Sequence, residues 1–440
     1  MHILHGPDLL ADFVTRLLST LADKFERARI WSPRMVVLAL IVASSFGSGR
    51  NRLAWQPLLM RLRREYGDSL EWDGVPDPSG LYRAMQKVEV AVLRQTMIVA
   101  EAILTQVVRH TPLVHGHRLI AIDGTRLSFR RTKALSRKFG LPRRSGEKSC
   151  HYPQALAVVA YDVLSKTVVA YELANHRIGE RTLAMRILRR LGPNCIVLMD
   201  RGFPSREMLD VLVGSGIPFV MRMVATDDGS WPEVREFLAS GRQYGRIDLA
   251  AISGTGKRST VTARIVQSAA PRRGRPRCNR TPKRLLVATN LTGSVWRNRV
   301  VIDLYLRRWD IETIFREIKE YLAAEGCLAT TPDGVEKELL GACIAQAMAA
   351  AVEIVALTMV ARDAWNAPRA RRCVFTLCLE VIAAAIAVAL HDTPKSRKTL
   401  ADLLDFVGKR RQRRRPGRAE KRYAFRVGSK WHLKADRGVR

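Results

Sequence analysis

The sequence predicts an α/β protein whose core is flanked by helical segments. Three observations support this fold class. Apolar residues recur at helical spacing through residues 1–112. From about residue 117, short runs rich in β-branched residues alternate with helical stretches. Ala-rich apolar segments of helical length follow in the last quarter of the chain. With 440 residues, 47% of them hydrophobic, the chain is expected to form two to four domains.

Residues 1–112 are predicted to form an N-terminal helical domain. In this region Ser32 and Pro33 form a typical helix start, a capping residue followed by proline. The segment "VPDPSGLYRAMQKV" repeats that pattern and predicts a short basic helix carrying Arg83 and Lys87. Such a helix suits a DNA-binding module, although an ordinary helical domain explains it equally well.

Residues 113–205 are predicted to form the first part of an α/β core. We expect strands at 118–123, 155–163, 166–173 and 195–200, with a helix at 180–191 before the last strand. The first and fourth strands each end in an aspartate, Asp123 in "AIDGT" and Asp200 in "LMDRGF". Either aspartate alone would be explained as a helix cap or a loop anchor.

Three further divisions are predicted downstream. Residues 206–300 carry strand-like runs between polar loops and indicate a β-rich insertion, whose loop at 268–284 has seven basic residues and no acid. Residues 301–395 are predicted to supply the second part of the core and the C-terminal helices. Residues 396–440 are predicted to be a basic tail. The apolar segments 339–361 and 374–390 contain Gln346, Glu353 and Glu380, which favours buried helices over membrane spans.

The charge of the chain indicates a polyanionic partner. The formal net charge is +33, so nucleic acid is the leading partner and an acidic membrane surface is the second candidate. The seven cysteines show no CxxC pair and no zinc spacing, which indicates reduced thiols. The first residues lack a signal-peptide pattern. We therefore expect a cytoplasmic, nucleoid-associated protein without membrane contact.

One predicted helix, "YLRRWDIETIFREIK" at 305–319, gathers chemically distinctive side chains. At about 100° per residue, Tyr305, Arg308, Glu312 and Lys319 would share a face about 60° wide. A solvated charged face is the ordinary explanation for such a set. Together with Asp123 and Asp200, however, Glu312 would complete a set of three carboxylates.

Three carboxylates are suited to divalent metal ions. Carboxylate oxygens are hard ligands for Mg²⁺ or Mn²⁺, and three of them can hold two ions about 3.5–4 Å apart for in-line attack on a phosphodiester. Arg308 and Lys319 would then grip the flanking phosphates. Tyr305 would hydrogen-bond to, or stack on, a displaced nucleotide.

These motifs resemble the insertion-sequence-4 family of bacterial DDE transposases. The resemblance rests on the spacing Y-(2)-R-(3)-E-(6)-K, on "DGT" and "DRGF" upstream, and on "LLVATNL" and "VIDLYLRRWDIE" around the helix start. It implies an RNase H-like core interrupted by a β insertion, and catalysis by Asp123, Asp200 and Glu312 with divalent metal.

The resemblance also implies roles in handling the transposon end. Tyr305, Arg308 and Lys319 would bind that end, often through a hairpin intermediate with a flipped base. In some relatives an aromatic residue before the strand at 285–290 stacks on this base. Lys283 and Arg284 occupy that place here, and Arg284 could stack as a planar cation.

We therefore expect a DNA transposase that uses two Mg²⁺ or Mn²⁺ ions and acts on double-stranded DNA, at terminal inverted repeats and at the target. We expect a homodimer in the DNA complex. Three alternatives stay open: an RNase H-like nuclease without strand transfer, a catalytically silent basic DNA-binding relative, and a membrane-surface protein.

Overall fold

A computed structural model describes residues 6–21, 31–45, 55–66, 74–107, 113–142, 151–225, 230–269, 284–322, 324–360 and 373–410. Its strands form one mixed sheet in the order β3-β2-β1-β4-β5-β8-β7-β6. The strands are β1 (Arg118–Ser128), β2 (Gln154–Asp162), β3 (Thr167–Asn175), β4 (Cys195–Met199), β5 (Phe219–Arg222), β6 (Tyr244–Ile252), β7 (Arg258–Ala269) and β8 (Arg284–Thr289). β1, β4 and β5 pair in parallel, and all other neighbours pair antiparallel.

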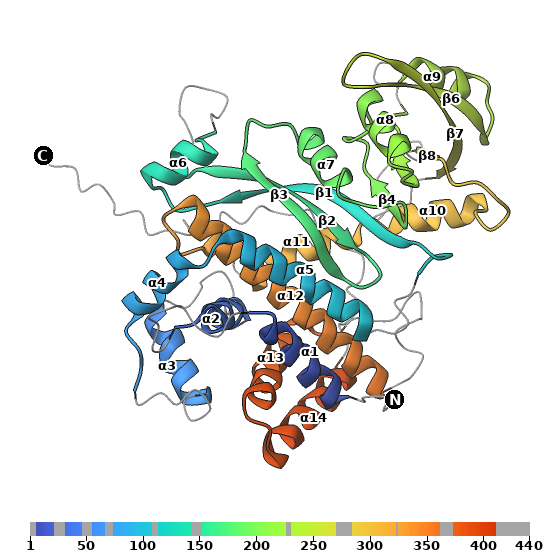
Figure 1. Cartoon of the computed structure of the whole chain (residues 1–440). Coiled ribbons are helices and arrows are strands. Elements are labelled where there is room, and N and C mark those ends of the chain that lie inside the picture. The colour runs from blue at the N-terminus through green and yellow to red at the C-terminus, as the bar shows by residue number, and fades with distance from the viewer. Residues whose placement is uncertain are drawn as a thin grey trace, which may run out of the picture.

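Helices cover both faces of the sheet (Figure 1). Alternate residues of a strand point to opposite faces. On β1, Leu119 and Ala121 pack into one apolar cluster, while Ile120 and Ile122 pack into the other. The second cluster includes residues of α7 (Glu180–Leu188), α8 (Arg206–Gly214) and α9 (Pro232–Ala239). Around β1 the sheet is therefore a buried middle layer, and a side chain on β1 can face either helical layer.

The larger helical layer contains helices from both the N-terminal and the C-terminal regions of the chain. It contains α1 (Pro7–Ser19), α2 (Pro33–Ser45), α3 (Trp55–Tyr66), α4 (Pro78–Lys87), α5 (Val90–Val107), α12 (Pro332–Val360), α13 (Phe375–Leu390) and α14 (Pro394–Lys409). α12 packs against α2, α5, α13 and α14. Close approach is possible because Gly341 meets Leu40 of α2, and Gly408 of α14 meets Ala356.

α12 is long and apolar enough to cross a membrane, alone among the helices in the described ranges. Its most apolar window is 83% buried inside the protein. Burial includes the polar side chains of Gln346 and Glu353, which bond to Lys166 O and Cys373 N–H. α12 thus has the burial of a core helix, as predicted for residues 339–361.

Local sequence signals account for several helix starts. The Ser32 hydroxyl accepts a 3.2 Å hydrogen bond from the Met35 N–H, as its predicted capping role requires. The Asp77 carboxylate caps α4 by accepting from the Ser79 N–H, and this bond lowers the pKa of Asp77. The basic helix predicted after "VPDP" is therefore present, with Arg83 and Lys87 exposed.

The predicted domain divisions stay predictions, but three packing facts bear on them. The strands in 206–300 extend the same sheet as β1 and β4. Helices from residues 1–112 pack on α12. α14 runs to Lys409, into the predicted tail, because Leu400, Leu404 and Val407 bury an apolar face at helical spacing. Residues 411–440 lie outside the described ranges.

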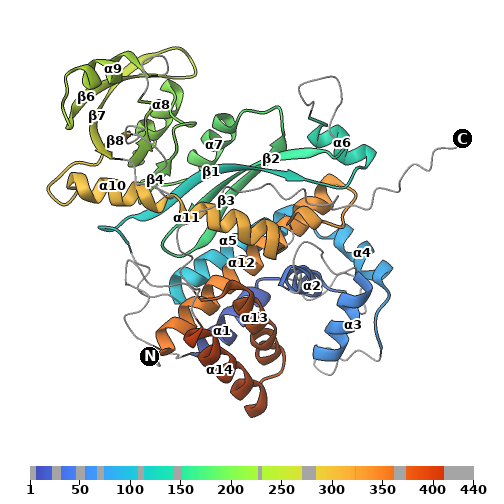
Figure 2. The same cartoon turned by 180° about the vertical axis from the view of Figure 1, so that it is seen from behind.

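The remaining helices connect these layers. α6 (Lys133–Phe139) follows β1, and a short 3₁₀ helix, η2 (Ala324–Gly326), precedes α12. Figure 2 shows α10 (Asn298–Arg307) and α11 (Asp310–Arg316) passing beside β4 and β1. This placement brings the segment 305–319 to the strands that carry the two aspartates.

Candidate active site

The two aspartates lie side by side on neighbouring parallel strands. β1 pairs with β4 from Arg118 opposite Cys195 to Ile122 opposite Met199. Asp123 and Asp200 are the residues that directly follow this last pair, one on each segment. Asp200 was predicted to be the last residue of a strand at 195–200, and β4 ends one residue earlier, at Met199. Asp123 does not end its strand, because β1 continues to Ser128 through antiparallel pairing with β2. The prediction of a strand end at Asp123 was wrong, although the parallel pairing does end there.

The predicted continuous helix over 305–319 is divided into three parts. α10 ends at Arg307, α11 begins at Asp310, and residues Glu317–Tyr321 form a π-helical turn, η1. At the first junction, Ile311 N–H bonds to Arg308 O and Glu312 N–H to Trp309 O, both at three-residue spacing. A tightened turn and a widened turn therefore flank α11, so the single-helix face drawn from ideal geometry was wrong.

Arg308 nevertheless lies between the two aspartates. Its Nη1 donates to Asp123 Oδ2 at 3.1 Å, and its Nη2 lies 3.8 Å from Asp200 Oδ2. The Arg308 side chain is only 5% exposed, so this cation is placed by the fold. Burial alone would lower the pKa of Arg308, but Tyr305, Asp200 and Asp123 raise it above its ordinary value.

Asp200 has two further partners. The Tyr305 hydroxyl donates to Asp200 Oδ1 at 3.1 Å, and Arg222 Nη1 lies 3.7 Å from the same oxygen. The Tyr305 ring is buried, so only its hydroxyl reaches the site. Burial and then the charge of Asp200 raise the pKa of Tyr305, which keeps its hydroxyl a proton donor.

Asp123 is a half-buried carboxylate with a raised pKa. Burial is the main cause, and the charges of Asp200 and Glu312 act in the same direction. The Gly124 N–H, which donates to Asp123 Oδ1 at 2.9 Å, and the charge of Arg308 oppose the shift. Asp123 is therefore harder to ionise than an exposed aspartate, mainly because it is buried.

The other predicted residues are placed as follows. Glu312 is exposed in the first turn of α11, within electrostatic range of Asp123. Lys319, in η1, donates from Nζ to Arg126 O at 2.7 Å. Arg284 begins β8 opposite Ala269. Its side chain and Lys283 lie outside the described part of the structure, as does the basic loop at 270–283.

Two charged residues near the aspartates escaped the sequence interpretation. Arg222 lies on β5, where nothing in a four-residue strand signals a contact with Asp200. Glu180 is the first residue of α7, a position where acids commonly favour the helix dipole. Its pKa is raised by burial and then by Asp123. The only available signal was the short spacing between Glu180 and the strand that leads to Asp200.

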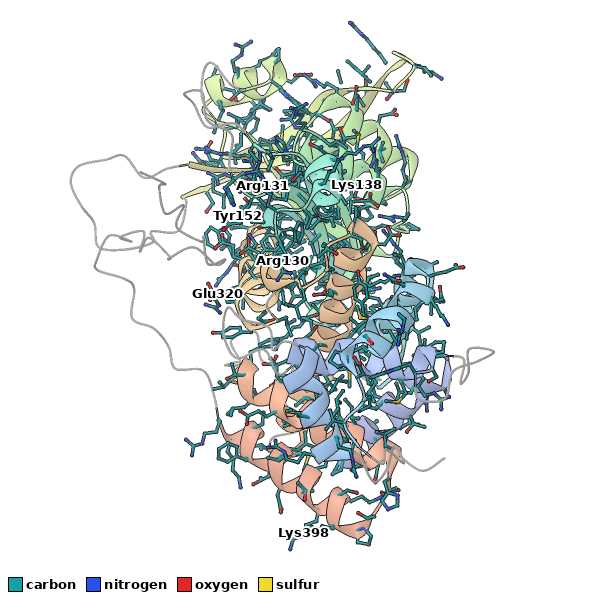
Figure 3. The ribbon with its side chains drawn as sticks, turned by 90° about the vertical axis from the view of Figure 1, so that its left-hand side faces the viewer. Arg130, Arg131, Lys138, Tyr152, Glu320 and Lys398 are labelled. Carbon is teal, nitrogen blue, oxygen red and sulfur yellow. The ribbon has the colours of Figure 1, made fainter. Side chains whose placement is uncertain are left out.

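Exposed basic side chains also lie just after β1 and on α6. Figure 3 shows Arg130, Arg131 and Lys138 on one side of the molecule, near Tyr152 and the exposed Glu320 of η1. Arg130 and Arg131 follow β1, and Lys138 is in the last turn of α6. This surface could contact the phosphates of a nucleic acid that enters the site.

The donor set fits a hard divalent ion only after a rearrangement. In the described ranges, no three His, Cys, Asp or Glu side chains meet closely enough to hold a metal as they stand. The guanidinium of Arg308 lies between Asp123 and Asp200, where it shows that this point accepts positive charge. All the acidic donors are carboxylates, which suit Mg²⁺ or Mn²⁺. A metal ion held by both aspartates at this point would therefore have to displace Arg308.

Comparisons with known proteins find similarity to the same kind of protein that the sequence motifs resemble. A profile of the family described as "Transposase DDE domain" matches residues 114–348, more than half of the chain. The chain is 24% identical over 274 residues to transposase InsG for insertion sequence element IS4 of Escherichia coli (strain K12). That match covers 61% of this chain and 59% of the relative, so the chain matches less than two thirds of the relative's length.

A solved structure shows a weaker likeness. The piggyBac transposase in a synaptic complex with hairpin DNA superposes with a TM-score of 0.44 and 11% identity, over 94% of this chain and 87% of that chain. A TM-score at this level supports no inference about the fold or the site.

Proposed function

The chain belongs to the family of transposases with a DDE domain, and from that premise we propose that it cleaves the ends of an insertion sequence and joins them to target DNA. The observation that supports this most directly is the adjacency of Asp123 and Asp200 on parallel strands beside α11, which carries Glu312. The order of the three carboxylates along the chain is the one that the family resemblance requires.

In this proposal, Asp123, Asp200 and Glu312 hold two Mg²⁺ or Mn²⁺ ions. DDE transposases generally use divalent metal ions. When bound, the ions would activate a water or a 3′-hydroxyl and neutralise charge on the scissile phosphate. Tyr305 holds Asp200 in place through its hydroxyl, a support that does not depend on metal.

Arg308 and Lys319 are proposed to bind the DNA end. When a metal replaces the guanidinium between the aspartates, Arg308 would become available to a phosphate next to the scissile bond. Lys319 lies beyond Asp123 along β1, at Arg126 O, where it can reach the next phosphate. For Arg284, we propose stacking on a displaced base, a role supported only by its place at the start of β8.

The proposed architecture is an RNase H-like core built from residues 113–205 and 301–395, with 206–300 as an insertion. A central β1 flanked by antiparallel β2 and parallel β4 supports it. Residues 1–112 would recognise the element's ends, and residues 396–440 would bind DNA without sequence preference. The partner would be double-stranded DNA, bound by a homodimer in the cytoplasm at the nucleoid.

The test uses the purified full chain and DNA that carries the terminal inverted repeats flanking its coding region. Wild-type protein with Mg²⁺ should cleave these ends and should join a pre-cleaved end to plasmid DNA. Asp200→Ala should do neither, while its DNA affinity stays near normal. Cleavage without joining would favour the nuclease alternative. Full cleavage by Asp200→Ala would refute the assignment of the site.

A further inference from the structure

β1 continues past Asp123 for five residues, paired with β2 on one edge. On its other edge, two side chains from the segment after α11 bond to its backbone. Lys319 Nζ donates to Arg126 O at 2.7 Å, and Glu325 Oε1 accepts from the Ser128 N–H at 3.3 Å. The second half of β1 is therefore held from both edges, and the proposed end-binding lysine lies along it.

The chain that follows this half of β1 carries positive charge alone. Residues 124–142 contain six basic residues and no acid. In α6, Leu135 and Phe139 are buried, so its cations occupy the opposite, solvent-facing side. All six basic side chains are exposed, and together they define the α6 surface: Arg126, Arg130, Arg131, Lys133, Arg137 and Lys138.

Acids of the protein leave much of this charge unbalanced. Within the described part of the chain, no ion pair involves Lys133, Arg137 or Lys138. By contrast, Arg190 on α7 and Arg206 on α8 are each paired with a glutamate. Side chains that stay exposed and cationic on one surface are suited to a row of phosphates.

The extended segment sets the distance between Asp123 and the α6 surface. The β1 ladder with β2 reaches Ser128, and the Phe129 N–H continues it by donating to Pro153 O at 3.0 Å. From Asp123 to Phe129 the chain advances about 20 Å at about 3.3 Å per residue, the length of about six base pairs of duplex DNA. α6 adds about 10 Å, or about three base pairs.

We propose that the α6 surface binds the phosphate backbone of the element's own terminal duplex, about six to nine base pairs inside the bond that is cleaved at Asp123 and Asp200. This inference rests on the proposed function, which makes Lys319 a ligand of the element's end. Lys319 lies along β1 between Asp123 and α6, so the direction from the aspartates towards α6 is the direction into the element. Target DNA and the DNA flanking the element are the competing occupants.

The test is hydroxyl-radical footprinting of the full-length protein on DNA that carries a terminal inverted repeat and its flank, in EDTA so that the DNA stays uncleaved. Wild type should protect sugars about six to nine base pairs inside the cleaved bond. Arg131→Gln/Lys138→Gln should lose this protection and keep the protection at the end itself. Both side chains are exposed on the same side of the molecule (Figure 3), so the change should leave the fold intact.

The matched control removes the same charge elsewhere. Lys257→Gln/Arg258→Gln alters two exposed cations between β6 and β7, on the opposite side of the molecule from α6 (Figure 1). This variant should keep the protection at six to nine base pairs. Loss of that protection in the control as well would show that net charge, and not the α6 surface, is responsible, and would contradict the proposal.

Uncharged DNA identifies the phosphates directly. Methylphosphonates in place of the phosphates six to nine base pairs inside the cleaved bond should weaken binding by wild type more than binding by Arg131→Gln/Lys138→Gln, because the variant has already lost those contacts. The variant should also flatten the salt slope on unmodified DNA by about 1.8, from about 0.9 for each phosphate. Equal losses from methylphosphonates in the two proteins would refute the contact.

The position of the lost protection distinguishes the occupants. If Arg131→Gln/Lys138→Gln loses protection on the flank, or weakens only the joining of a pre-cleaved end to target DNA, the terminal duplex is not the partner and the inference is wrong. If wild type protects and cleaves the terminal repeat while the variant keeps the whole footprint, the inference fails and the proposed function stands. If wild type neither prefers terminal repeats to scrambled DNA nor cleaves them, the proposed function fails, and the inference fails with it.

Discussion

Arg308 Nη1 lies 3.1 Å from Asp123 Oδ2, although the two residues are 185 positions apart in the chain. Its Nη2 faces Asp200, so one buried guanidinium balances two aspartates. If Asp123 and Asp200 hold a divalent ion, as we propose, that ion and Arg308 compete for the same carboxylates, and this competition can be measured.

We predict that Arg308→Ala destabilises the metal-free protein by on the order of 1.5 kcal/mol, the lower end for hydrogen bonds to charged groups, because both carboxylates are partly exposed. Mn²⁺ should stabilise this variant more than it stabilises wild type, since the cation then replaces a missing charge. Urea unfolding with EDTA and with Mn²⁺ measures both effects. Equal Mn²⁺ stabilisation of the two proteins would show that Arg308 and the metal do not compete.

The same substitution should slow DNA cleavage with little loss of DNA affinity. Arg308 is one cation among 74 lysines and arginines, but it would place the scissile phosphate, and a 1 Å misplacement can cost about a hundredfold in rate. The control is Arg307→Ala, one position earlier at the end of α10 and without a contact to either aspartate in the ion pairs described. If Arg307→Ala slowed DNA cleavage as much as Arg308→Ala, a specific role for Arg308 would be contradicted.

Tyr305 should act through its hydroxyl at the site and through its ring in the core. Tyr305→Phe removes the bond to Asp200 Oδ1 and should slow cleavage with a small effect on stability. Tyr305→Ala also leaves a cavity, and should lower the free energy of unfolding by about 3–5 kcal/mol, as large aromatic truncations do. Cleavage rates and urea unfolding of the two variants distinguish these roles. A Tyr305→Phe enzyme with the wild-type cleavage rate would show that the bond to Asp200 is dispensable.

The raised pKa of Glu180 predicts a pH dependence of stability. Below the pKa of the unfolded state this carboxyl is protonated in both states and has no effect. As pH rises above that value towards the raised folded pKa, the folded state loses stability, because ionisation is less favourable there. In EDTA, Glu180→Gln should therefore be more stable than wild type at pH 7, with the difference vanishing near pH 4. Thermal unfolding across this pH range is the measurement. A Glu180→Gln variant that is less stable than wild type at pH 7 would contradict the prediction.

The crossing of α14 and α12 should tolerate no side chain at Gly408. A Cβ there would lie 2.4 Å from the backbone oxygen of Ala356, which cannot move as a side chain can. Gly408→Ala should cost about 1–3 kcal/mol, as overpacking does. Gly214→Ala in α8 is the matched control, since a Cβ at Gly214 meets nothing within 4 Å. Similar unfolding free energies for the two variants would show that α14 is displaced at little cost.

The exposed cations of α4 offer a test of DNA-end recognition. Since α2 and α5 pack on α12, the test uses the full chain and not a fragment of residues 1–112. If Arg83 and Lys87 contact bases, Arg83→Ala and Lys87→Ala should weaken binding to terminal repeats more than to scrambled DNA. If they contact only phosphates, both DNAs should lose affinity equally, and the salt slope should flatten by about 1 per residue.

The strands and helices of the core could be predicted because they are short, apolar and bounded by turn residues. β2, β3 and α7 begin within one residue of the expected positions. The length of β1 could not be predicted, because Gly124 and Thr125 are poor strand signals and only pairing with β2 extends the strand to Ser128. The breaks around α11 also depend on tertiary packing, because ideal helical spacing contains no information on a tightened or widened turn.

The candidate site was predictable only where its residues belong to a spaced motif. Asp123, Asp200, Arg308 and Glu312 share such a pattern, and the structure brings Arg308 to both aspartates. Glu180 could not be predicted, because an acid at a helix start has an adequate explanation in the helix dipole. Its proximity to Asp123 depends on the packing of α7 on the sheet, which no local pattern encodes.

The position of α12 between the first and last helices has a consequence for synthesis. Leu40 of α2 packs against Gly341, about 300 residues later, so its partner leaves the ribosome roughly 15–60 s afterwards at 5–20 residues per second. Until then, the apolar surface of α2 lacks the helix that covers it, and contacts of such long range form slowly. A chain that stops before residue 332 would carry both aspartates and most of the positive charge, yet its N-terminal helices would have no α12 to pack on. The chain must therefore be translated at least through α14 before the helical layer and the site beside it can both assemble.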